Sequence, residues 1–173
     1  MNRTIFTTAL LFIALLLLQV LVCNHIVLFG AAVPFIFIYF IVRQPISMST
    51  NLLLTLSFLL GLGVDLFSDT AGMNALACTV LAVCKKKVFF SFVQKDDFSV
   101  TFTPGIASMG FGAYFRYLFS MVAIYCVLIF SIEYFSFSDV KEIILKASAS
   151  CVLTTALLLA VDSLAFSKRE KRL

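Results

Sequence analysis

Two carboxylates lie among small and polar residues within an otherwise apolar stretch. Residues 61–74 read GLGVDLFSDTAGMN and contain Asp65 and Asp69. An ionisable group inside a membrane is energetically costly, so it is a candidate for function by default. Gly61 and Asp65 are four residues apart and therefore share one face of a helix. This spacing predicts that Asp65 points into a tight helix contact or into a polar pocket at the outer membrane face.

The chemistry of this stretch has three interpretations. The carboxylates can cap helices by accepting hydrogen bonds from backbone amides, contact a partner protein, or take part in proton or ion chemistry. Ser57 and Gly61 form a small-x-x-x-small pair, which lets another helix approach closely. Ser68, Asp69 and Thr70 suit a turn or the N-cap of the next helix. The residues predicted to contact a partner are Ser57, Gly61, Asp65, Asp69, Gly72 and Asn74, with Asn74 in the first turn of that helix.

No other set of residues points to catalysis. His25 is the single histidine, so a histidine-based metal site or catalytic triad cannot be built. The H-E-x-x-H, G-x-S-x-G and P-loop motifs are missing from the sequence. The five cysteines form no C-x-x-C pair, which favours buried thiols over a zinc site or a disulfide framework. Asp162 is hypothesised to pair with Arg116 or with a cation of the C-terminal tail. We therefore predict that the protein is not an enzyme and uses no cofactor or metal.

These residues are embedded in a chain with the composition of a membrane protein. Of the 173 residues, 62% are hydrophobic and 13% are charged, whereas a soluble domain has about 45–50% apolar and about 25% charged residues. The chain contains 20 Phe and no Trp, which leaves Tyr as the one aromatic residue with a polar group for the membrane interfaces. The composition predicts a single membrane-embedded, all-α domain over residues 1–173.

Apolar runs of about 20 residues, the length that crosses a bilayer, predict a bundle of six membrane-spanning helices. The spans are expected at about residues 4–23, 26–42, 51–67, 72–93, 114–132 and 143–166. The first run is interpreted as a retained span, because no small-x-small cleavage site of a signal peptide follows it. Pro34 is expected to kink the second helix, which neighbouring helices can tolerate. Ala147, Cys151 and Thr155 share one face of the sixth helix and favour close packing.

The fourth span has two interpretations. Its apolar part ends at Cys84, before three consecutive lysines at positions 85–87. Either the helix continues past the lysines, which snorkel to the interface, or residues 65–72 dip into the membrane inside the protein. A long loop is expected over residues 94–112, and a short basic tail over residues 167–173.

The distribution of positive charge predicts the orientation. If the N-terminus is cytoplasmic, the cytoplasmic segments hold all of the 13 lysines and arginines except Lys141 and Lys146. The positive-inside rule then places both termini in the cytoplasm, which requires an even number of spans. Orientation and contact with anionic membrane lipid explain the net charge of +4. No nucleic-acid partner is therefore predicted.

The stretch from residue 61 to residue 75, GLGVDLFSDTAGMNA, resembles the rod shape-determining MreD family. That family carries a Gly-x-x-x-Asp-x-Phe-Ser segment at this place in its third and fourth spans. Further matches are Asn24-His25, Phe29-Gly30 and Pro34 at the second span, Phe115-Arg116-Tyr117 opening the fifth, and Glu133-Tyr134-Phe135-Ser136-Phe137 closing it. The length, the six spans and the inward termini agree with the family, so the resemblance covers essentially the whole chain.

The resemblance implies a scaffold of the cell-elongation machinery in the bacterial inner membrane. Such proteins bind MreC, a single-span protein with a periplasmic domain, and help to organise lateral peptidoglycan synthesis and cell shape. Through MreC they are linked to the MreB filament, the RodA glycosyltransferase and an elongation-specific penicillin-binding transpeptidase. The implied fold is similar to the six-helix substrate-binding subunit of energy-coupling-factor transporters. A vitamin-binding subunit of that kind, which needs a sealed outer pocket with convergent polar groups, is the alternative function. An intramembrane enzyme acting on lipid is a third.

Overall fold

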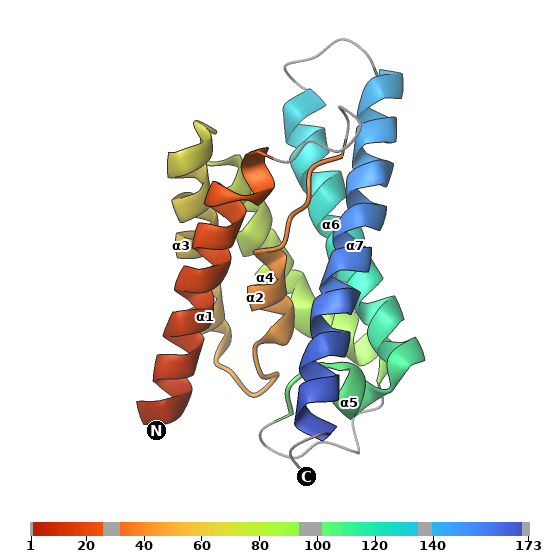
Figure 1. Ribbon diagram of the computed structural model, residues 1–173. Helices are drawn as coiled ribbons and strands as arrows, with labels where there is room; N and C mark the ends of the chain where they lie inside the picture. Colours follow the sequence, from red (N-terminus) through yellow and green to blue (C-terminus); the bar gives the residue numbers. More distant parts are fainter. Residues whose placement is uncertain (1, 26–31, 94–101, 135–139, 171–173) are drawn as a thin grey trace.

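The computed structural model describes residues 2–25, 32–93, 102–134 and 140–170, and its regular elements are helices (Figure 1). In chain order they are α1 (Asn2–Leu21), the 3-10 helix η1 (Cys23–His25), α2 (Ile38–Arg43), α3 (Thr50–Ser68), α4 (Met73–Phe92), α5 (Ile106–Met109), α6 (Phe111–Tyr134) and α7 (Val140–Glu170). The predicted all-α fold is thus confirmed for this part of the chain.

Three stretches of helix, Thr50–Ser68, Phe111–Ile132 and Ile144–Leu164, are long and apolar enough to cross a membrane. Figure 1 shows the long helices side by side along one axis, with the start of α1 and the end of α7 at the same end of the bundle. We call this end the terminal end. The opposite end, which holds residues 69–72 between α3 and α4, is called the turn end.

The helices predicted over residues 51–67 and 72–93 are present as α3 and α4. Residues 65–68 form the last turn of α3; the alternative in which residues 65–72 dip into the membrane stays a prediction. Helix α4 continues past the three lysines, but Lys85 does not snorkel as predicted. Its side chain is 1% exposed, and Nζ donates a hydrogen bond of 2.5 Å to the carbonyl oxygen of Gln44.

The predicted loop and tail are partly helical. The described part of residues 94–112 contains α5 and the first residues of α6, while residues 94–101 lie outside the described residues. The predicted tail overlaps the end of α7, which continues to Glu170, and residues 171–173 also lie outside the description.

The prediction of a helical second span over residues 26–42 is wrong for residues 32–37 and is confirmed for residues 38–42, which belong to α2. Residues 32–37 are not helical, and α2 begins only at Ile38; residues 26–31 lie outside the described residues. Pro34 has no amide hydrogen and disfavours the helical conformation of the residue before it. The chain therefore passes through the bundle in an irregular form before α2 begins (Figure 1).

Two hydroxyl groups of α7 replace the missing helical hydrogen bonds of this segment. The amide of Val33 donates to Ser150 Oγ at 3.0 Å, and the amide of Phe35 donates to Thr154 Oγ1 at 3.1 Å. Four helical residues rise about 6 Å, close to the roughly 6.6 Å of two extended residues. The spacing of the two hydroxyls thus matches the spacing of the two amides.

Gln19 of α1 satisfies the same segment from the other side. Its Oε1 accepts a hydrogen bond from the amide of Ile36 at 3.0 Å, and its Nε2 donates to the carbonyl oxygen of Pro34 at 3.0 Å. A non-helical backbone at membrane depth is tolerated only where protein groups bind its polar atoms. Gln19 is 1% exposed, and Ser150 and Thr154 are each 0% exposed. The irregular segment is therefore bound by buried side chains on two faces.

The double variant Ser150→Ala/Thr154→Val is expected to lower the free energy of unfolding by about 2 kcal/mol, because a buried amide left without an acceptor costs about 1–3 kcal/mol and the two amides here belong to half-buried residues. Thermal unfolding of the purified protein in detergent measures this loss. Ser148→Ala is the matched control, since Ser148 is exposed and bonds only to its own helix at Leu145. Equal stability of the double variant and the control would show that the α7 hydroxyls do not hold the segment.

Candidate functional site

Helices α3 and α4 pack closely together at Gly61. A Cβ atom at this position would lie 2.5 Å from the carbonyl oxygen of Asn74 and 2.6 Å from Cα of Ala75. Ser57, one turn earlier, is 0% exposed, and its Oγ has no hydrogen-bond partner among the described residues. The small-x-x-x-small spacing therefore serves a contact with the next helix of the same chain.

The carboxylate of Asp65 caps the start of α4 from the end of α3. Oδ1 accepts hydrogen bonds from the amide of Asn74 at 3.1 Å, from Asn74 Nδ2 at 2.9 Å and from Thr70 Oγ1 at 2.5 Å. Oδ2 accepts one from the amide of Ala75 at 2.8 Å. The first amides of a helix have no partner within it, and Gly72 at the N-cap has no side chain to supply one. The interpretation of Asp65 as a capping residue is confirmed.

A tight turn brings Asp65 to these amides. Asp69 adopts the left-handed conformation, with φ 53° and ψ 39°, and its amide donates to the carbonyl oxygen of Asp65. Gly72 also has a positive φ, 79°, a conformation that a residue with a side chain adopts only with strain. The turn predicted from Ser68, Asp69 and Thr70 is thus present, and the side chain of Asp69 is exposed at its surface.

Asn74 links the turn to helix α6. Its Oδ1 accepts a short hydrogen bond from the hydroxyl of Tyr125, which is fully buried. The Tyr125 ring also packs edge-on against Phe35 and Phe37, with centroids 5.1 Å and 5.7 Å apart. The Asp65 carboxylate is therefore one member of a connected network that includes α3, α4, α6 and the irregular segment.

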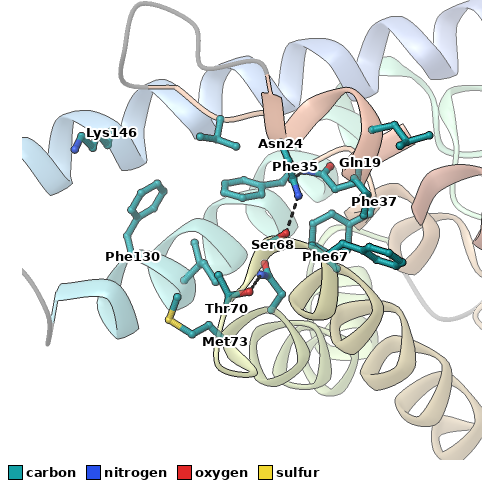
Figure 2. Close-up of a pocket in the computed structure, with 16 residues that line it drawn as sticks. Gln19, Asn24, Phe35, Phe37, Phe67, Ser68, Thr70, Met73, Phe130 and Lys146 are labelled. Carbon is teal, nitrogen blue, oxygen red and sulfur yellow. Dashed lines mark hydrogen bonds between the residues drawn. The ribbon is translucent and has the colours of Figure 1, made fainter. Parts of the chain in front are cut away.

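A pocket of about 620 Å³ lies at the turn end, beside this network (Figure 2). In Figure 2 Asn24 and Ser68 lie next to one another in its lining, and Asn24 Nδ2 donates to Ser68 Oγ at 2.6 Å. Its lining consists of Gln19, Val20, Leu21, Asn24, Val33, Phe35, Phe37, Val64, Phe67, Ser68, Thr70, Met73, Asn74, Ile129, Phe130 and Lys146. The pocket thus combines an aromatic wall with amide and hydroxyl groups.

Asp162 organises a second polar cluster near the terminal end. Its carboxylate accepts hydrogen bonds from Tyr39 Oη at 2.9 Å, from Arg43 Nη1 at 2.5 Å and from the amide of Ile106 at 2.9 Å. The hypothesis that Asp162 pairs with Arg116 is wrong, because Arg43 forms the ion pair and Arg116 is exposed. The side chains of the tail cations lie outside the described residues. Asp162 therefore fixes α7 to α2 and α5.

The structure also shows the burial of the other residues that the sequence singled out. Cys151 and Thr155 are buried and Ala147 is half-buried, as the shared face of α7 predicted. Four of the five free cysteines are buried, and Cys84 is half-buried. In the described part of the chain, no three His, Cys, Asp or Glu side chains gather as metal ligands would; the side chain of His25 lies outside it.

Of the six predicted contact residues, Gly61, Asp65 and Asn74 come together at the α3–α4 contact, with Ser57 buried one turn away. Asp69 and Gly72 lie on the turn instead, exposed and half-buried respectively. Sequence reasoning missed Gln19 and the paired hydroxyls of α7. Their signal is visible afterwards: Gln19 is the single amide side chain in the first apolar run, and the two hydroxyls are four residues apart.

No family profile, curated protein or solved structure shows a significant match to this chain. Over its described residues the chain is all-helical and carries apolar helices of membrane-spanning length.

Proposed function

We propose that this protein is a multi-pass scaffold of the bacterial inner membrane that binds an MreC-like single-span protein of the cell-elongation machinery. Through that partner it is linked to MreB, RodA and an elongation-specific penicillin-binding transpeptidase, and it helps to organise lateral peptidoglycan synthesis. It converts no small molecule. The six passes in this proposal are α1, residues 32–43, α3, α4, α6 and α7.

The arrangement of charges supports this orientation. Arg43 at the end of α2 and the lysines at positions 85–87 in the second half of α4 lie toward the terminal end. Lys141 and Lys146 lie in the first turns of α7, at the turn end. Since cytoplasmic segments carry the excess of Lys and Arg, the terminal end faces the cytoplasm in this proposal, and the turn end faces outward.

The main support for a scaffold function is that the two buried carboxylates, Asp65 and Asp162, are bound by groups of the protein itself. Asp65 is 4% exposed and accepts four hydrogen bonds that fix the α3–α4 turn. Asp162 is 2% exposed and accepts three that fix α7 to its neighbours. A carboxylate whose oxygens are occupied by structural donors is poorly placed to exchange protons with a substrate. The two carboxylates therefore support a structural role within the fold rather than a catalytic one.

The exposed part of the turn is the proposed contact for the partner. Ser57, Gly61, Asp65 and Asn74 are buried, so they act on the partner through the shape of the turn. Asp69 is exposed, and Leu66 beside it is 76% exposed. An apolar side chain of this size at the end of a span, next to polar turn residues, suits the outer end of a single transmembrane helix together with the segment that follows it.

A photo-reactive residue placed at Leu66 is expected to crosslink an MreC-like single-span protein in native membranes. Val127 on α6 is the matched control, because it is 64% exposed on a different helix, and no crosslink to that protein is expected there. Tagged protein is recovered from the crosslinked membranes, and its partners are identified by mass spectrometry. Recovery of an ATPase with its membrane coupling subunit, and of no wall-synthesis protein, would replace the scaffold by the transporter alternative.

A further inference from the structure

The pocket at the turn end takes no part in the proposed contact at Leu66. Some of its polar groups donate all of their hydrogens within the protein, and others do not. Both hydrogens of Gln19 Nε2 are donated, to Asn24 Oδ1 and to the carbonyl oxygen of Pro34, each at 3.0 Å. Both hydrogens of Asn74 Nδ2 are donated as well, to Asp65 and Thr70. The deepest amides are therefore committed to the fold and have no donor left for a ligand.

Asn24 and Ser68 retain donors. Asn24 Nδ2 has two hydrogens and gives one to Ser68 Oγ. Because Ser68 accepts in that bond, its own hydroxyl hydrogen stays available, and among the described residues neither remaining hydrogen has an acceptor. A ligand that places an oxygen acceptor beside this bonded pair, within reach of both remaining hydrogens, completes their hydrogen bonding. No Asp or Glu belongs to the lining, so the acceptor oxygens of phosphate and ester groups suit the wall formed by Asn24 and Ser68.

The apolar part of the lining suits a different part of the ligand, a hydrocarbon chain. Phe35, Met73, Ile129 and Phe130 form much of the wall. Two lining residues, Leu21 of α1 and Phe67 of α3, are each 66% exposed on the outside of the bundle. In a membrane, large apolar side chains at the edge of a pocket face hydrocarbon rather than water. The pocket therefore adjoins the region that acyl chains occupy.

We propose that this pocket binds one phospholipid of the bilayer, with ester or phosphate oxygens accepting hydrogen bonds from Asn24 and Ser68. The upper part of an acyl chain lies against Phe130 and Met73, and the rest leaves the pocket beside Phe67. A volume of about 620 Å³ is within the usual range of ligand pockets, about 300–1,000 Å³, and holds part of the lipid. The proposal rests on the membrane location in the proposed function but not on its protein partner, so loss of the partner leaves it intact.

Native mass spectrometry of the full chain, released from nanodiscs of phosphatidylglycerol and phosphatidylethanolamine, tests the site. The wild type is expected to keep one phospholipid under activation that removes all others. Ser68→Phe fills the pocket and removes one donor, and is expected to lower the retained fraction about tenfold, which corresponds to about 1.4 kcal/mol. Thr55→Phe is the matched control, because it places the same ring on the exposed face of α3 and should retain lipid as the wild type does.

A second measurement needs no variant. Phosphatidylglycerol with a diazirine in its acyl chain is photolysed in nanodiscs that contain the wild-type protein, and labelled peptides are mapped. Labelling is expected at residues 67–74 and 129–130. Equal lipid retention by Ser68→Phe and the wild type, or labelling confined to the exposed face of α1, would overturn the proposal. A retained mass that matches no phospholipid would also overturn it, in favour of an amphiphile taken up from water.

Discussion

Gly61→Ala is expected to lower the free energy of unfolding by about 2 kcal/mol, although alanine is the better helix former by about 0.5–1 kcal/mol. The added methyl group would lie 2.5 Å from the Asn74 carbonyl oxygen and 2.6 Å from Cα of Ala75. Both are backbone atoms, so no rotamer change relieves the clash and α3 and α4 must separate. Overpacking of this kind costs about 1–3 kcal/mol, and the separation also lengthens the bonds to Asp65. Reversible unfolding in mixed detergent measures the loss.

Two other helical glycines provide a graded control. Gly112 on α6 has no atom within 4 Å of the position of a Cβ, so Gly112→Ala should be neutral or slightly stabilising. At Gly63 the obstructing atom is the terminal methyl of Leu16, which can rotate away, so Gly63→Ala should fall between them. Gly61→Leu is expected to abolish the α3–α4 packing and, with it, recovery of the proposed protein partner. Unchanged partner recovery from that variant would separate this helix contact from the scaffold function.

The sequence predicts the α3–α4 part of the site because its signals are local. Gly61 and Asp65 share a helix face, and residues 68–70 have turn chemistry, so both the close contact and the cap could be expected. The identity of the approaching helix could not, because a small-x-x-x-small pair has the same pattern whether it contacts a partner or the next helix of its own chain. The structure resolves this in favour of α4.

The rest of the fold depends on contacts between residues far apart in the sequence. Residues 32–37 are apolar enough for a helix, and their irregular form is bound by Gln19 of α1 and by side chains more than 100 residues away on α7. Asp162 likewise pairs with Arg43 across 119 residues, and Lys85 reaches the carbonyl of Gln44 across 41. Hydropathy counts apolar residues along the chain and carries no information on such partners, so the prediction of a helix over residues 32–37 was wrong.

Asp65→Ala is expected to produce the largest loss among single substitutions at the turn, about 3–5 kcal/mol. The carboxylate binds two backbone amides, of Asn74 and Ala75, and two side chains. Its removal leaves the two buried amides without acceptors, at about 1–3 kcal/mol each, and releases Asn74 from its fixed position against Tyr125. Asp65→Asn retains one acceptor oxygen and should lose less, about 2 kcal/mol by the same reasoning. Thermal unfolding in detergent and protection of the α4 amides from hydrogen exchange measure both effects.

The control for Asp65 is Asp69→Asn, which removes a carboxylate from the same segment. Asp69 is exposed and left-handed, and asparagine tolerates that conformation, so a change within about 0.5 kcal/mol is expected. Comparing Asp65→Asn with Asp69→Asn separates the effect of hydrogen bonding from the effect of charge. Both variants lose one negative charge, but only Asp65→Asn weakens the cap of α4. The same comparison also separates capping from proton or ion chemistry at Asp65. If capping is its role, partner recovery by Asp65→Asn falls in proportion to the loss of stability. A fully stable Asp65→Asn that no longer recovers the partner would assign the carboxylate a function beyond the fold.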